Sequence, residues 1–200
     1  MISSSKWCYF TSRSLICDNY TAVVRRESLL MTSRGQRATI RPMFICGVDE
    51  AGRGPLAGPV TAAAVILPDG FPIERLSDSK RLSPARRTEL FALITGGAVA
   101  WALGWASHEE IDELNILRAS HLAMRRAVDA LAVKPERAIV DGSIVPELAV
   151  DAKAIVKADA TVPAVMAASI LAKVARDRWM EAYGRIEPGY EFHAHKGYPT

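Results

Sequence analysis

The hydrophobic positions of this chain form short continuous runs in its first folded part and alternate with helical patterns further on. Runs at 45–49, 60–67 and 98–106 have the length of buried strands and end in glycine, proline or polar turns. Shorter strands are expected at 137–141 and 154–157. We expect the first two runs, which are joined by a glycine-rich turn, to pair as a hairpin.

Three helical regions alternate with these strands. Ser83 and Pro84 suit the N-cap and first turn of one helix, and Ser107 with Glu110 can form a capping box at the start of another. Gly184 is a typical helix end. The predicted spans are 84–95, 107–131 with one break, and 163–183. This order predicts an α/β domain with a mixed sheet flanked by helices.

Residues 1–42 differ from the rest of the chain. They are rich in serine and arginine, carry seven basic against two acidic residues, and lack hydrophobic periodicity, so we expect a disordered tail. It is either an organellar transit segment or an upstream stretch translated from a start assigned too early. Met43 directly precedes the first strand, which favours the second interpretation and a folded domain over 43–200.

The net charge of +3 does not by itself indicate a nucleic-acid partner, because residues 43–200 carry 18 basic and 20 acidic side chains. A basic surface must therefore be local, and the candidate cluster can equally be the solvated face of a helix. Its members are Lys80, Arg81, Arg86 and Arg87.

Cysteine usage and hydropathy limit the cellular setting. The three cysteines show no CxxC spacing, so neither a disulfide framework nor a zinc site is indicated, and a reducing cytoplasm fits best. No apolar run approaches the roughly 20 residues that a membrane span needs. We expect a protein without a membrane anchor.

The segment 47–60 carries the strongest chemical signal. Asp49 and Glu50 follow a buried strand, where ionised carboxylates are costly unless a partner such as a divalent cation compensates them. Adjacent strand residues point to opposite faces, so both can serve one site only if the strand ends here, and Gly52 supplies that ending. The alternative is an exposed acidic turn.

Two further carboxylates follow predicted strands. Asp141 precedes Gly142 and can belong to a simple turn, and Asp159 can instead cap the next helix. Taken with Asp49 and Glu50, they offer an all-oxygen donor set for a hard cation, Mg²⁺ or Mn²⁺, without paired histidines or thiols nearby in sequence.

Several other polar and aromatic residues have two interpretations. Ser169, Lys173 and Asp177 share one helix face and form either a surface ladder or a phosphate contact. His193 and His195, without further soft ligands, do not indicate a metal site. The tryptophans at 101 and 105 share a strand face and are expected in the core.

Five segments, in order, resemble the motifs of the ribonuclease HII family. They are 47–60, Asp78 to Ser83, Val140 to Gly142, Val156 to Asp159 with Ala167 to Asp177, and His195 to Thr200. The resemblance implies a ribonuclease H-like fold and an endoribonuclease that cuts the RNA strand of RNA·DNA hybrids. It also implies cleavage at single ribonucleotides in duplex DNA, leaving 3′-hydroxyl and 5′-phosphate ends.

The resemblance also assigns roles to residues. Catalysis and two Mn²⁺ or Mg²⁺ ions are implied for Asp49, Glu50, Asp141 and Asp159. The backbone of Gly52, Arg53 and Gly54 is implied to recognise a ribose 2′-hydroxyl, and Tyr198 to pack against the neighbouring deoxyribose, with Lys80, Ser169 and Lys173 as further substrate contacts. We expect a cytoplasmic monomer.

The chain departs from the family pattern at a few points. Ala158 stands where glycine is usual, Ser143 stands where asparagine is frequent, and the sequence stops at Thr200, where the family continues with a helical stretch, so we expect a C-terminally incomplete domain. The alternative function is an inactive nucleic-acid-binding module of the same fold, against which the four acids argue. A dinucleotide-binding loop is excluded by its glycine spacing.

Overall fold

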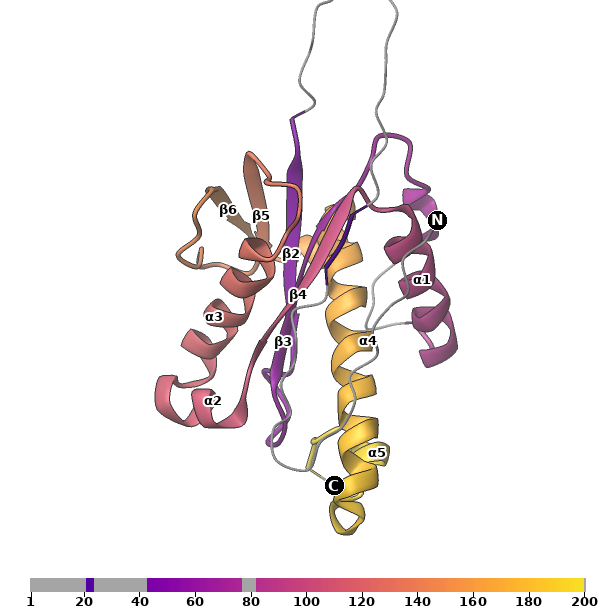
Figure 1. The fold of residues 1–200 in the computed structure, drawn as a ribbon, viewed down its shortest axis with the longest axis vertical. Coiled ribbons are helices and arrows are strands. Elements are labelled where there is room, and N and C mark those ends of the chain that lie inside the picture. The colour runs from indigo at the N-terminus through magenta and orange to yellow at the C-terminus, as the bar shows by residue number, and fades with distance from the viewer. Residues whose placement is uncertain (1–20, 24–42, 77–81, 200) are drawn as a thin grey trace, which may run out of the picture.

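The structure is a computed structural model that describes residues 21–23, 43–76 and 82–199. These residues form a six-stranded sheet with helices on both faces (Figure 1). The strands are β1 (Thr21–Val23), β2 (Ile45–Ala51), β3 (Val60–Ile66), β4 (Ala100–Ala106), β5 (Arg137–Asp141) and β6 (Asp151–Ile155). The helices are α1 (Pro84–Gly97), α2 (His108–Leu114), α3 (Ile116–Asp129), α4 (Pro163–Ile186) and α5 (Phe192–His195), with 3₁₀ turns η1 (Ile73–Arg75), η2 (Ala158–Ala160) and η3 (Pro188–Tyr190).

The sheet is mixed, as predicted. Its strand order is β1-β4-β3-β2-β5-β6, with antiparallel pairs among β1 to β4 and parallel pairs from β2 to β5 and β5 to β6. The expected hairpin of β2 and β3 is confirmed, with Val48 opposite Ala64. Val48 also lies opposite Val140 of β5, so these two parallel strands end at the same edge of the sheet.

Each face of the sheet packs against its own helix layer. α3 covers one face, and α1 with α4 covers the other (Figure 1). Alternate residues of β3 serve the two layers: Ala62 faces the α3 side and Ala63 the α4 side. A Cβ at Gly47 would lie 2.2 Å from the backbone carbon of Ala164, so glycine here lets α4 lie directly against β2.

The helix starts follow the sequence prediction. Ser83 caps α1 and accepts a hydrogen bond from the Arg86 N–H, with Pro84 in the first turn. Ser107 and Glu110 form the predicted capping box of α2. The expected break is at Asn115, whose side chain caps α3. Both tryptophans of β4 pack into the apolar cluster under α1 and α4, as predicted.

Four local predictions differ from the structure. The last strand covers Asp151–Ile155 and not 154–157, because its alternation of polar and apolar residues already begins at Asp151. α4 continues through Gly184, where a Cβ would lie 2.6 Å from the His193 nitrogen, so this glycine admits the next segment and does not end the helix. The sequence predicts that His193 and His195 flank a loop, whereas both belong to the helix α5.

The fourth difference concerns the N-terminal stretch. Thr21–Val23, inside the expected disordered tail, form β1 and pair with β4. The remainder of that prediction lies outside the described residues. In the parts of the chain that the structure covers, no helix combines the length and the apolar character that crossing a membrane requires.

Candidate active site

Three aspartates meet at the edge where β2 and β5 end. One carboxylate oxygen each of Asp49, Asp141 and Asp159 lies within 4.8 Å of the others. The parallel pairing of β2 and β5 brings the first two together, since each follows a valine in paired register. The Ala158 N–H donates to Asp141 Oδ1 at 2.7 Å, which folds η2 back onto β5 and brings in Asp159.

The environment of Asp49 makes its negative charge unfavourable. The carboxyl is 5% exposed. Burial holds its pKa well above the usual range, and the charges of Glu50 and Asp141 raise it further, while hydrogen bonds from the Ser169 side chain and the Glu50 N–H lower it in part. A cation among these oxygens would remove the repulsion, and an all-carboxylate donor set fits a hard divalent ion.

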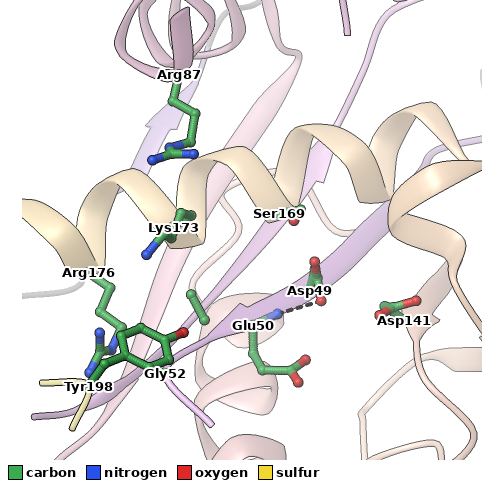
Figure 2. A pocket seen from close by; sticks show the side chains of 10 residues that line it. Asp49, Glu50, Gly52, Arg87, Asp141, Ser169, Lys173, Arg176 and Tyr198 are labelled. Atoms are coloured by element: carbon green, nitrogen blue, oxygen red, sulfur yellow. Dashed lines mark hydrogen bonds between the residues drawn. The ribbon is translucent and has the colours of Figure 1, made fainter. Parts of the chain in front are cut away.

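Glu50 lies apart from the three aspartates. β2 continues to Ala51, one residue past Glu50, so Asp49 points toward α4 and Glu50 points away from it (Figure 2). The Glu50 Oε1 lies 3.3 Å from Arg53 Nη1. Its charge also acts on His121 of α3. The pKa of His121 is lowered overall, mainly by burial and also by the charge of Arg53, and the charge of Glu50 opposes this in part.

Asp49 and Asp141 line one end of a cleft of about 370 Å³. In Figure 2, Asp49 and Asp141 lie at one end, Tyr198 and Gly52 at the other, and Lys173 projects from α4 between them. The lining residues are Asp49, Glu50, Ala51, Gly52, Arg87, Asp141, Ser169, Lys173, Arg176 and Tyr198. The cleft therefore joins the carboxylates to the glycine-rich turn.

Two of the cations that line the cleft, Lys173 and Arg87, were singled out from the sequence. Lys173 Nζ lies 2.8 Å from Asp177 Oδ1, so the predicted ion pair exists beside the cleft and not on a remote surface. Arg87 reaches the cleft from α1 and donates to the Leu82 carbonyl at 2.6 Å. It belongs to the basic cluster predicted from the sequence. Lys80 and Arg81, of the same cluster, lie outside the described residues.

The other end of the cleft joins two distant parts of the chain. The N–H groups of Leu56 and Ala57 donate to the Gly197 carbonyl at 2.9 and 3.3 Å. This brings Tyr198 over the glycine-rich turn, so that a Cβ at Gly54 would lie 3.6 Å from Tyr198 Cε1. The resemblance implies substrate contacts for both segments, and the structure brings the two segments together.

The turn before Tyr198 is held by a histidine. His195 Nδ1 accepts the Gly197 N–H at 3.0 Å, and its Nε2 lies 2.6 Å from the Tyr190 carbonyl. Both ring nitrogens thus have backbone partners, so His195 ties the turn to the end of η3.

Sequence reasoning missed one residue of the cleft. Arg176 of α4 is 1% exposed and donates to three backbone carbonyls, those of Pro59, Ala57 and Lys196, at 2.9, 2.8 and 2.9 Å. Its place in the motif 167–177 was visible, but carbonyl partners have no side-chain signature in a sequence.

A mixed sheet with helices on both faces and a carboxylate cleft at its edge is the arrangement expected of a ribonuclease H-like fold. A family model described as Ribonuclease HII matches residues 46–200. The ribonuclease HII of Laribacter hongkongensis is 61% identical over 78% of this chain and 80% of its own, and that of Moorella thermoacetica is 56% identical over 78% and 76%. The crystal structure of ribonuclease H2 from Pyrococcus horikoshii OT3 matches with a TM-score of 0.64 and 31% identity, over 79% of this chain and 82% of that one.

The chain therefore belongs to the ribonuclease HII family. It is an endoribonuclease that acts on RNA·DNA hybrids, and its aspartate cluster is a candidate divalent-metal site. The comparisons confirm the family that the sequence resembles and the predicted fold class.

Proposed function

We propose that this endoribonuclease also nicks duplex DNA at single embedded ribonucleotides and leaves 3′-hydroxyl and 5′-phosphate ends. The observation that carries the proposal is the arrangement of one cleft. The aspartate cluster lies at one end, and the glycine-rich turn, which packs against Tyr198, lies at the other. Only the 2′-hydroxyl distinguishes a ribonucleotide within DNA. An enzyme that cuts selectively there therefore needs one set of groups that recognises the sugar and another that hydrolyses the phosphodiester.

Asp49, Asp141 and Asp159 would hold Mn²⁺ or Mg²⁺, with Glu50 as the further carboxylate on the same cleft. Divalent ions bound there would supply water activation and charge stabilisation for phosphodiester hydrolysis. The buried hydroxyl of Ser169 orients Asp49 by a hydrogen bond. The role of Glu50 as a ligand remains a prediction, because its side chain lies outside the aspartate cluster.

The remaining cleft residues would bind the nucleic acid. Lys173 and Arg87 place positive charge along the cleft, where it can attract phosphodiester oxygens. The backbone of Gly52, Arg53 and Gly54 would meet the 2′-hydroxyl, and the half-exposed ring of Tyr198 would pack on the adjacent deoxyribose. A contact from Lys80, a monomeric state and a cytoplasmic location remain predictions.

The experiment compares three labelled duplexes: DNA with one ribonucleotide, the same DNA without it, and a continuous RNA·DNA hybrid. We expect nicking of the first and third with Mn²⁺ or Mg²⁺ and none with EDTA. The new 3′ end should be extended by a DNA polymerase without prior phosphatase treatment, which shows a 3′-hydroxyl. If the enzyme cuts the hybrid but leaves the single-ribonucleotide duplex intact, the proposal is refuted. If it cuts neither substrate, the inactive binding module is favoured.

A further inference from the structure

Three backbone carbonyls from two separate segments converge on one guanidinium. Arg176 Nε and Nη2 donate to Pro59 and Ala57, which lie in the last part of the glycine-rich turn, and Nη1 donates to Lys196, which precedes Tyr198. The two segments thus meet each other through the Gly197 carbonyl and meet α4 through Arg176.

Met180 of α4 also packs against both segments, since a Cβ at Gly58 would lie 2.4 Å from its Sδ and one at Gly197 would lie 3.3 Å from its Cε. Among the hydrogen bonds described above, those of Arg176 join both segments to α4. We call the part of the cleft that these two segments form the sugar end.

The buried charge is tolerated because each nitrogen has an acceptor. Burial lowers the pKa of Arg176, while the negative charge of neighbouring Asp177 raises it. A planar guanidinium presents its donors in a fixed fork, so it can hold three carbonyls at fixed relative positions. Lysine would keep the charge but not this geometry, which makes the two residues unequal here.

The glycines of the turn fit around this guanidinium. A Cβ at Gly52 would lie 2.5 Å from Arg176 Nε, and one at Gly58 would lie closest to Met180 Sδ and then, at 3.2 Å, to Arg176 Nη2. Both glycines also have positive φ angles, 113° and 91°. The turn therefore packs directly against Arg176, with no room for side chains between them.

We propose that Arg176 is a positioning residue that fixes the gap between the Gly52–Gly54 turn and Tyr198, and thereby sets selectivity for a ribonucleotide followed by DNA. It acts through the backbone that it holds and not by contact with the substrate. The inference rests on the proposed function, because the gap matters only if these two segments read the sugar. Asp49 and Asp141 have other hydrogen-bond partners, Ser169 with the Glu50 N–H and the Ala158 N–H respectively, so we expect the aspartate cluster to keep its arrangement when Arg176 is replaced.

The test compares Arg176→Lys and Arg176→Met with the matched control Arg178→Met, an exposed arginine two residues along α4 that lies over Phe91. For each protein, kcat/KM is measured on the single-ribonucleotide duplex and on the continuous hybrid. The ratio of kcat/KM on the single-ribonucleotide duplex to kcat/KM on the hybrid should fall about tenfold in Arg176→Lys, as for loss of one hydrogen bond to a charged group. The same ratio should stay unchanged in the control. Mn²⁺ affinity, measured by calorimetry, should stay the same.

Amide hydrogen exchange tests the anchoring independently of activity. Peptides covering 52–59 and 196–199 should exchange faster in Arg176→Lys, whereas a peptide covering the β5 strand should not change. If Arg176→Met fails to fold, the lysine variant alone decides. An equal loss on both substrates, or unchanged exchange in the two segments, would overturn the inference. Failure of the proposed function is distinguishable, because the wild-type protein would then leave the single-ribonucleotide duplex intact.

Discussion

The two ends of the cleft are built by different means. At the carboxylate end, side chains carry the chemistry, and neighbouring parallel strands bring Asp49 and Asp141 together. At the sugar end, backbone is presented to the cleft, and the side chain of Arg176 serves to hold that backbone. The contrast shows that sheet register can bring two charges together, with the third added by one hydrogen bond from η2, whereas a shaped stretch of backbone needs contacts between distant segments.

The largest effect is expected from Asp49→Asn, which attacks the carboxylate end alone. Loss of the Asp49 carboxylate as a metal ligand should lower the cleavage rate by about 10³-fold on both the hybrid and the single-ribonucleotide duplex. The reason is that several kcal/mol of charge stabilisation disappear. Nicking assays in Mn²⁺ and in Mg²⁺ measure this. A rate within threefold (roughly 0.6 kcal/mol) of wild type would remove Asp49 from the site.

Metal and pH should act on the stability of the same end. Because the pKa of Asp49 is raised on folding, the folded protein holds its proton more tightly, and stability falls as pH rises from about 4, the ordinary aspartate value, through the raised one. Asp49→Asn should therefore gain in Tm relative to the wild type as pH rises through this interval. Mn²⁺ at about 100 times its Kd should restore about 2.7 kcal/mol to the wild type and less to the variant.

Thermal melts from pH 4 to pH 8, with EDTA or Mn²⁺, separate these two contributions. A difference in Tm between the wild type and Asp49→Asn that does not vary with pH would contradict the assigned burial and repulsion.

Gly52→Ala attacks the sugar end and should cost about 2 kcal/mol of stability, because the new Cβ would meet the Pro59 carbonyl at 2.6 Å and the Arg176 side chain at 2.5 Å. The matched control is Gly70→Ala, where φ is also positive, at 75°, but no atom lies within 4 Å. That control isolates the backbone term, about 1 kcal/mol. Calorimetric melts compare the two, and equal losses would show that the close packing does not matter.

The smallest effect is expected from Tyr198→Ala, which removes a ring from the cleft without touching its frame. Stability should change by less than about 0.5 kcal/mol because the side chain is half-exposed. Cleavage at a single ribonucleotide should fall about tenfold, in line with the loss of an aromatic packing contact, and Tyr198→Phe should retain it. Tyr190→Ala, an exposed tyrosine outside this cleft, serves as the control, and an equal loss there would argue against a specific role.

The sequence was informative wherever a signal lay in side chains close along the chain. The buried strand before Asp49, the strand before Asp141 and the capping residues of α1 and α2 all follow from local patterns, and the structure has them. Asp159 was ambiguous because its position depends on the Lys157 residue, whose φ of 59° turns the chain after β6. The aspartate cluster confirms that it faces the other two acids.

Long-range and one-residue effects were beyond the sequence. Whether Glu50 joined Asp49 depended on β2 ending before or after Ala51, and strand ends cannot be located to one residue from composition. Arg176 was missed because its acceptors are backbone carbonyls 117 and 119 positions away, which any residue could supply. The burial of its guanidinium is explained only by the two segments whose carbonyls surround it in the structure.

The helix α4 has a consequence for how nucleic acid must fit. It carries Ser169 beside the aspartates, Lys173 midway and Arg176 at the sugar end, and seven residues of helix correspond to about 10 Å. Both working ends are fixed to one uninterrupted rod, so their spacing cannot adapt unless the rod bends. If the two ends bind phosphate and sugar as proposed, we expect a strand whose rise between these groups does not match this spacing to be cut poorly.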